Sequence, residues 1–180
     1  MNCRGCGAGL NLPLIDLGTS PPSNAYLSAQ QLESAEQWVP LKVQVCQSCW
    51  LVQTEDYTSA ESLFDADYAY FSSFSSTWLE HAERYVASMV ERFALDARSR
   101  VVEVAANDGY LLQYVAGRGI ACLGVEPTHS TATAARAKGL DIRELFFGRE
   151  NALQLREEGW AADLMTANNV LAHVPDINDF

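Results

Sequence analysis

Four of the five cysteines form two pairs with the same spacing, Cys3 with Cys6 and Cys46 with Cys49. A two-residue spacer lets both thiolates of a tight turn bind one ion, and two such turns complete a tetrahedral site of four sulfurs. The alternatives are pairs that arise by chance or a redox dithiol, but a redox motif needs only one pair beside a βαβ unit. The spacing therefore predicts a Zn2+ ion, and a structural one, because the protein fills all the ligand positions.

The residues around each pair indicate how the cysteines are held. Gly5 and Gly7 suit the first pair, because the turn needs a positive φ and open backbone N–H groups near sulfur. The second pair lies between residues 40–45 and 50–53, which are both predicted to be strands, so it is expected at the tip of a hairpin. We predict a zinc-binding domain over residues 1–60.

A second candidate site follows the predicted strand over residues 101–105. This strand runs into a turn and then a helix, which is where doubly wound folds bind a nucleotide-like ligand. Only Gly109 remains of the dinucleotide fingerprint, and this disfavours a pyrophosphate, which needs close backbone contact at the start of the helix. Glu103 adds a negative charge that suits a ligand with positive amino and sulfonium groups.

Glu126 follows the next predicted strand, residues 121–125. An acidic side chain at this place, about twenty residues after the first turn, can accept both ribose hydroxyls of a nucleotide. The geometry is shared by NAD and S-adenosylmethionine sites. A single acidic residue at the end of a strand is usually only solvated, but its spacing from the first turn favours a functional role.

Alternating strands and helices position this second site. Residues 99–180 show regular βαβ alternation, which predicts a parallel sheet with helices on both faces. The expected strands are residues 101–105, 121–125, 141–147 and 162–167, and the expected helices are residues 110–115, 130–138 and 150–158. Residues 61–98 are predicted to form an aromatic connector and a helix over residues 77–94, which begins with a capping box of Thr77 and Glu80.

The composition excludes several classes of protein. A formal charge of -11, with Arg4 and Lys42 as the only basic residues before residue 61, argues against a nucleic-acid partner. No apolar run approaches the length of about eighteen residues that indicates a membrane span. Met1 is followed at once by polar residues and cysteine, which excludes a secretory signal. We therefore expect a cytoplasmic protein with no membrane or nucleic-acid partner.

The chain resembles the sugar C-methyltransferases that act on nucleotide-linked 4-keto-deoxysugars. The resemblance is carried by an ordered set of motifs along nearly the whole chain: Cys3-x-x-Cys6 and residues 16–24, 40–53, 67–73, 103–112, 124–127 and 168–176. Each motif is weak alone, whereas the ordered set is specific. The fold class that the resemblance implies is α/β, with a small N-terminal zinc-binding β module followed by the first half of a Rossmann-like methyltransferase sheet over residues 99–180.

The resemblance also implies S-adenosylmethionine as the cofactor and a small-molecule nucleotide-sugar as the substrate. Phe146 or Phe147 would lie near adenine, and Asn168 and Asn169 would flank the methionine end. The implied cofactor-binding residues are Glu103, Ala105, Asn107, Gly109, Glu126, Phe146, Asn168 and Asn169. Members of this family are considerably longer, so we expect further strands and part of the substrate site to lie beyond Phe180, and this chain alone to be inactive.

The implied reaction transfers a methyl group to a carbon beside a ketone, and this carbon must first lose a proton to a base. His173 is the candidate base, because it follows the fourth predicted strand at the rim where substrates meet the cofactor. The alternative is a histidine at the start of a helix with a structural hydrogen bond. Tyr68 or Tyr70 could offer a phenol to the ketone or the base, although aromatic residues in a connector more often pack.

Two other classes of function compete with methyl transfer. A nicotinamide-linked oxidoreductase would share the fold, but it would need the glycine fingerprint that this first turn lacks. A zinc-ribbon interaction module would explain the cysteines but not the turn after the first strand. Calorimetry with S-adenosylhomocysteine and with NAD separates the three.

Overall fold

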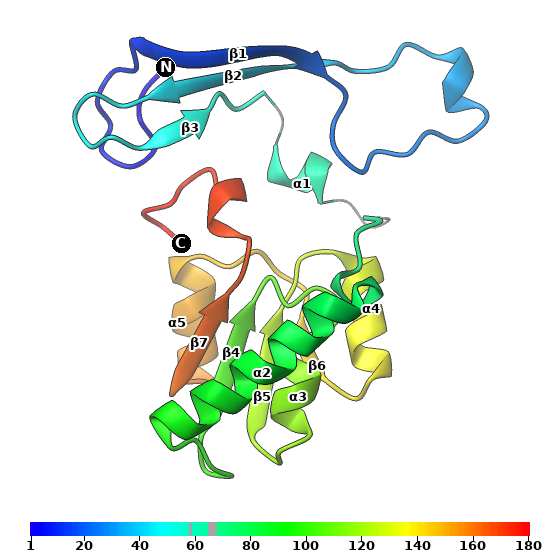
Figure 1. The fold of residues 1–180 in the computed structure, drawn as a ribbon, viewed down its shortest axis with the longest axis vertical. Helices are drawn as coiled ribbons and strands as arrows, with labels where there is room; N and C mark the ends of the chain where they lie inside the picture. Colours follow the sequence, from blue (N-terminus) through cyan, green and yellow to red (C-terminus); the bar gives the residue numbers. More distant parts are fainter. Residues whose placement is uncertain (58, 65–67) are drawn as a thin grey trace. The chain divides into compact units, whose positions relative to one another are not determined.

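The computed structural model describes residues 1–57, 59–64 and 68–180, and the chain divides into two compact units (Figure 1). The first unit comprises residues 1–63 together with residues 173–180, and the second comprises residues 64–172. Among the described residues, no helix is both long enough and apolar enough to cross a lipid bilayer.

The first unit is built on an antiparallel sheet. Its strands, in the order β1-β2-β3, are β1 (Leu12–Ser20), β2 (Val39–Val45) and β3 (Val52–Thr54). Strands β2 and β3 form a hairpin with the second cysteine pair in the turn between them, as the sequence predicts. The short helical elements η1 (Gln31–Glu33) and α1 (Ala60–Leu63) complete the unit.

The hydrophobic core of the first unit is very small. Of the hydrophobic residues that the structure describes there, only Cys3, Leu10 and Cys46 are buried, with Ala8 and Leu51 packed against them. Every residue of β1 except Ser20 is exposed. Because small domains with little apolar burial need other sources of stability, a metal at the cysteines is expected to supply much of the folding free energy here.

The second unit contains a four-stranded parallel sheet with the order β6-β5-β4-β7. Its strands are β4 (Arg100–Val104), β5 (Ala121–Val125), β6 (Asp141–Arg143) and β7 (Leu164–Ala167). Its helices are α2 (Ser76–Phe93), α3 (Leu112–Ala116), α4 (His129–Ala137) and α5 (Arg149–Glu157). Two short 3-10 turns, η2 (Ser72–Phe74) and η3 (Leu171–His173), flank these elements. The α/β class and the β module before the sheet are confirmed.

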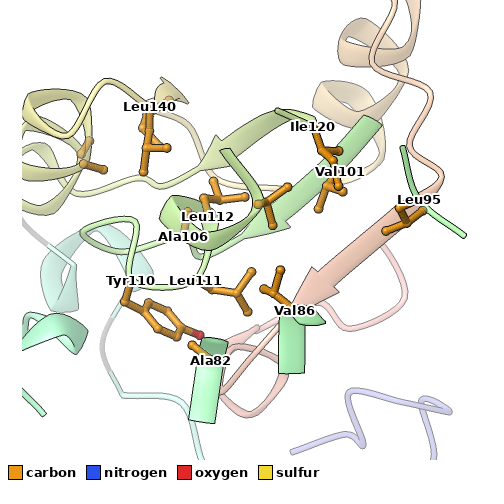
Figure 2. Packing of buried hydrophobic residues seen from close by; sticks show 14 residues of the cluster. Ala82, Val86, Leu95, Val101, Ala106, Tyr110, Leu111, Leu112, Ile120 and Leu140 are labelled. Carbon is orange, nitrogen blue, oxygen red and sulfur yellow. The ribbon is translucent and has the colours of Figure 1, made fainter. Parts of the chain in front are cut away.

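Alternating residues of the parallel strands pack on opposite faces of the sheet. Val101 and Ile142 join the larger cluster, which helices α2, α3 and α4 cover through residues that include Ala82, Val86 and Leu112 (Figure 2). The opposite face is covered by α5. Its cluster consists of Val102, Leu123, Val125 and Leu155. Helices therefore lie on both faces, as βαβ alternation predicts.

Two predicted boundaries are wrong for local physical reasons. The strand expected over residues 141–147 ends at Arg143, because Glu144 pairs with His129 and Arg136, while Phe147 packs into the α5 cluster. The other correction concerns the start of α2. The Thr77–Glu80 capping box is absent. The helix begins earlier, at an N-cap formed by Ser75, whose Oγ accepts a hydrogen bond from the Trp78 backbone N–H at 3.2 Å.

Candidate functional site

The predicted metal ligands come together at one point of the first unit. The Sγ atoms of Cys3, Cys6, Cys46 and Cys49 all lie within 4.8 Å of one another. Two of the sulfur–sulfur distances, Cys3 to Cys49 and Cys6 to Cys46, are 3.6 Å. A tetrahedral zinc ion with Zn–S bonds of about 2.3 Å separates its sulfurs by about 3.8 Å. The arrangement of the thiols therefore fits Zn2+.

Hydrogen-bond donors favour the thiolate form that a metal needs at Cys3 and Cys46, whereas at Cys6 and Cys49 the neighbouring sulfurs outweigh the backbone donors and raise the pKa. Ser48 N–H lies 3.4 Å from Cys46 Sγ, and the backbone N–H groups of Cys49 and Ser48 lower the pKa of the Cys46 thiol. Gln53 Nε2 donates to Cys3 Sγ at 3.3 Å. Burial raises the pKa of Cys3, but backbone donors and this Gln53 contact outweigh it and leave the pKa at about 6. Metal ligation requires deprotonated thiols, so these donors prepare the site.

The two cysteine turns share one backbone pattern. In the first, Gly7 N–H donates to the Cys3 carbonyl, and in the second, Trp50 N–H donates to the Cys46 carbonyl, both at 2.8 Å. The donor residue is left-handed in each turn, with φ of 74° at Gly7 and 63° at Trp50. The prediction for Gly7 is confirmed. Gly5 has no positive φ, so that part of the prediction is wrong for it, but its backbone N–H lies near sulfur as expected and helps to lower the pKa of Cys3.

The turn after β4 keeps the backbone shape of a glycine-rich loop although it has lost most of the glycines. Ala105 (φ 57°), Asn107 (φ 50°) and Gly109 (φ 75°) are all left-handed. Asparagine and glycine tolerate this conformation, whereas alanine is strained in it. A Cβ on Gly109 would lie 2.2 Å from Leu140 Cδ1, so this glycine is also needed for packing against the region after α4.

We expect Ala105→Gly to raise the free energy of unfolding by about 1 kcal/mol, because glycine relieves the left-handed strain. Ala94→Gly is a matched control, since Ala94 (φ 50°) is left-handed at the end of α2, away from the turn. Chemical denaturation of the purified variants measures both. Stabilisation by Ala94→Gly together with destabilisation by Ala105→Gly would contradict the strained geometry of the turn.

Glu126 joins the carboxyl ends of β4 and β5. Its carboxylate is 4% exposed and accepts a hydrogen bond from Asn107 N–H at 2.8 Å on Oε2. On Oε1 it accepts from Thr128 N–H at 3.0 Å and from the Thr128 hydroxyl. A carboxylate has about four acceptor sites. Protein donors fill three of them, so two ribose hydroxyls can be accepted only if the Thr128 hydroxyl gives up its position.

Glu103 is a buried carboxyl in the middle of the parallel sheet. It is fully buried in β4, and neither of its carboxylate oxygens has a hydrogen-bond partner. Burial raises its pKa well above the ordinary value of 4.5, and the Tyr110 hydroxyl and Leu112 N–H nearby act in the opposite direction without closing a hydrogen bond. Thr166 pairs with Glu103 in the sheet register, and its buried hydroxyl is also without a partner. Such orphaned polar atoms fit a ligand that brings its own positive or donor groups.

Asn107 fastens the aromatic connector to the turn. Its Nδ2 donates to the Tyr70 carbonyl at 2.9 Å, and its Oδ1 accepts from Ser72 N–H at 2.8 Å. Ser130 Oγ donates to the Tyr68 carbonyl at 3.0 Å. The backbone of Tyr70 is therefore held at the turn after β4, and the backbone of Tyr68 is held at α4. Tyr70 itself is 51% exposed.

Three other residues predicted to bind the cofactor, Asn168, Asn169 and Phe146, lie in different surroundings. Asn168 Nδ2 donates to the Tyr110 hydroxyl at 3.2 Å, and the Tyr110 ring stacks on Trp78 with centroids 5.8 Å apart. Asn169 is exposed and left-handed, with φ of 52°. Phe146 is 39% exposed. Only Asn168 is thus connected to the Glu103 region, through Tyr110.

His173 ends η3 and belongs to the first unit, with the cysteines. Its role as a base stays a prediction, as do the phenol roles of Tyr68 and Tyr70.

Sequence reasoning missed three polar side chains around the turn. Thr128 is the N-cap of α4. A threonine before an apolar helical pattern is an N-cap signal, but the helix was expected to begin at Ser130. Thr166 was visible as one polar residue inside an apolar strand. Lys138 gave no such signal, because its Nζ donates to the Asp108 carbonyl and to Ser73 Oγ only through the tertiary fold.

Comparison with known proteins identifies the family to which the chain belongs. Residues 3–64 match the family described as "Putative zinc binding domain". The chain is 28% identical to the C-methyltransferase NovU of Streptomyces niveus over 177 residues, which cover 98% of this chain and 42% of that protein. The chain thus spans less than half the length of this curated relative. Residues 78–180, more than half of the chain, match the family described as "Methyltransferase domain". The chain therefore belongs to the methyltransferase-domain family, with a zinc-binding domain match before it.

Proposed function

We propose that the protein acts in the transfer of a methyl group from S-adenosylmethionine to carbon. The observation that carries this proposal is the buried Glu103 carboxyl, whose oxygens have no partner among the described residues, in a chain of the methyltransferase-domain family. The positive group of a cationic ligand would pair with these unpartnered carboxylate oxygens. The same oxygens would repel a pyrophosphate. The name of the relative NovU supports carbon as the methyl acceptor.

In this proposal, different residues of the second unit bind different parts of S-adenosylmethionine. Glu103 and Thr166 would face the amino acid end, and Asn168 would hold Tyr110 at the same place. Glu126 would accept a ribose hydroxyl, and the left-handed backbone at Ala105 would allow close approach of the ligand. S-adenosylmethionine supplies the methyl group as an electrophile. The four-cysteine site has no open position for substrate, so a zinc ion there would be structural.

We further propose that the acceptor is a nucleotide-linked 4-keto-deoxysugar, which the ordered motifs of the sequence support. A ketone makes the neighbouring C–H acidic enough for a protein base to remove its proton. In this proposal His173 takes the proton, and the phenol of Tyr68 or Tyr70 donates a hydrogen bond to the enolate oxygen.

The test is the affinity for S-adenosylhomocysteine, measured by isothermal titration calorimetry on the purified protein. We expect binding to the wild type and none to NAD. Glu126→Ala should weaken the affinity by about 1–3 kcal/mol, the scale for hydrogen bonds to an ionised group, which is a factor of about 5 to 150 in the dissociation constant.

Two controls separate binding from folding in this test. Glu144→Ala makes the same change of charge in the same unit, at a carboxylate that pairs with Arg136 on the surface, and should leave the dissociation constant unchanged. Thr128→Val removes the hydroxyl that competes for Glu126 Oε1 and should preserve or improve affinity. An unchanged dissociation constant in folded Glu126→Ala would show that Glu126 does not contact the ligand, and tighter binding of NAD would overturn the proposed cofactor.

A further inference from the structure

The segment over residues 174–178 contacts the first cysteine turn. Asn178 Nδ2 donates to the carbonyls of Arg4 and Gly5, at 3.0 and 3.2 Å. Arg4 Nη1 lies 3.5 Å from the Val174 carbonyl and donates toward it. Both carbonyls that Asn178 contacts belong to the residues between Cys3 and Cys6, so the backbone that encloses the metal ligands is also the surface on which this segment docks.

Arg4 is held rigidly enough to serve as an anchor. Its side chain is 12% exposed, and Nη2 donates to the Thr54 carbonyl at 2.9 Å and to Asp56 Oδ1 at 2.7 Å. Its backbone N–H donates to Gln53 Oε1 at 3.0 Å. The same Gln53 donates through Nε2 to Cys3 Sγ, so one side chain links a metal ligand to the anchor.

The space at Gly5 adds an apolar contact to these hydrogen bonds. A Cβ on Gly5 would lie 3.4 Å from Ile177 Cδ1 and 3.3 Å from Leu51 Cδ2. Ile177 therefore packs against the turn where a glycine leaves room. Within the segment, Asp176 Oδ1 accepts from the backbone N–H groups of Asn178 and Asp179, which gives the segment a defined turn that can dock as a unit.

We infer that the cysteine turn is the docking site of residues 174–178, through Arg4 and Asn178, so that zinc loading orders the segment that directly follows His173. A four-sulfur ion fixes the positions of the carbonyls of Arg4 and Gly5, and without the ion the turn loses the bonds that hold it closed. Arg4 and Asn178 are then positioning residues for His173. The docking itself is independent of the proposed function, and only its catalytic consequence rests on that function.

Hydrogen–deuterium exchange of the zinc-loaded protein tests the inference. The reporting amides are those of Asn178, Asp179 and Phe180, which donate to the Asp176 side chain or carbonyl. Asn178→Ala lies outside the cysteine turn and should raise their exchange about tenfold, the effect of losing about 1.4 kcal/mol of docking. Arg4→Ala should do the same, and removal of zinc from the wild type with a chelator should do at least as much.

Linkage gives a second measurement that does not depend on activity. If zinc strengthens docking, docking must strengthen zinc binding by the same factor. Zinc affinity measured by competition with a chromophoric chelator should therefore fall in Asn178→Ala, by no more than the factor by which zinc removal loosens the segment in the wild type. Arg98→Ala is the control for Arg4→Ala, because Arg98 pairs with Asp96 in the second unit and should change neither quantity.

Each outcome decides the matter. Unchanged exchange in Asn178→Ala, or protection of the segment that survives zinc removal, would overturn the inference. If Arg4→Ala no longer binds zinc, its exchange cannot separate docking from metal loss, and Asn178→Ala is then the variant that tests the inference. Faster exchange in Asn178→Ala would support the docking whatever the outcome of a methyl-transfer assay, and unchanged methyl transfer by a longer, active form of the protein carrying this variant would refute only the positioning of His173 by the docked segment.

Discussion

Replacing Cys46 with serine should abolish stoichiometric zinc binding and the cooperative structure of the first unit. Cys46 is fully buried among the sulfurs, and the apolar cluster around it contains only two other buried residues, Cys3 and Leu10. Structural zinc supplies about 10–16 kcal/mol of apparent binding free energy in small zinc domains. A core of this size offers nothing comparable, so strands β1 to β3 should lose their protection from hydrogen exchange. The second unit has its own core and should keep its parallel sheet.

Cys122→Ser is the matched control for this experiment. Cys122 lies in β5 of the second unit, and its thiol is outside the four-sulfur group. The variant should bind as much zinc as the wild type, measured by elemental analysis of natively purified protein. Less than about half an equivalent of zinc in the wild type itself, or a Cys46→Ser protein whose first unit still unfolds cooperatively, would contradict the structural role of the metal.

Glu103→Gln should make the protein more stable and a weaker binder. The folded state raises the pKa of Glu103, mainly through burial, so folding takes up a proton in the range above the ordinary value of 4.5. Stability from this group is therefore full below pH about 4.5 and falls as the pH rises toward the folded pKa. Glutamine has no proton to lose, so the variant should gain most over the wild type at neutral pH. Its affinity for S-adenosylhomocysteine should fall about tenfold or more, since a cationic ligand loses its counter-charge.

The pH profile distinguishes this explanation from simple repacking. Thr166→Val removes the other orphaned hydroxyl on the same face of the sheet and should stabilise the protein equally at every pH. Urea unfolding of wild type and both variants at pH 4.5, 6 and 8 gives the comparison, with those values chosen to span the window above the ordinary pKa. A gain from Glu103→Gln that does not grow with pH would show that burial does not raise the pKa of Glu103 above its ordinary value.

The parts that sequence predicts well are those that depend on local spacing. The cysteine pairs are defined by a two-residue spacer that allows one tight turn, and the observed turns follow it. Strand β5 begins and ends where its apolar run does, at Ala121 and Val125.

The parts that sequence could not predict depend on contacts between distant residues. The loop after β4 keeps its shape with only one glycine, Gly109, because Asn107 is held from several sides, by Glu126, Tyr70 and Ser72. The early end of β6 at Arg143 follows from the ion pairs that Glu144 makes with residues of α4. Trp50 occupies a left-handed position that its side chain would not suggest, because the cysteines fix the turn around it.

The satisfied carboxylate of Glu126 also bears on how fast the protein can exchange its ligand. One acceptor site of Glu126 is open, so a second ligand hydroxyl would have to replace the hydrogen bond made by the Thr128 hydroxyl, and the free energy gained from it is the difference between two similar bonds. The same donor is ready to return when the ligand departs, and no buried charge is then left without a partner. Such an arrangement favours rapid release of spent cofactor over tight retention.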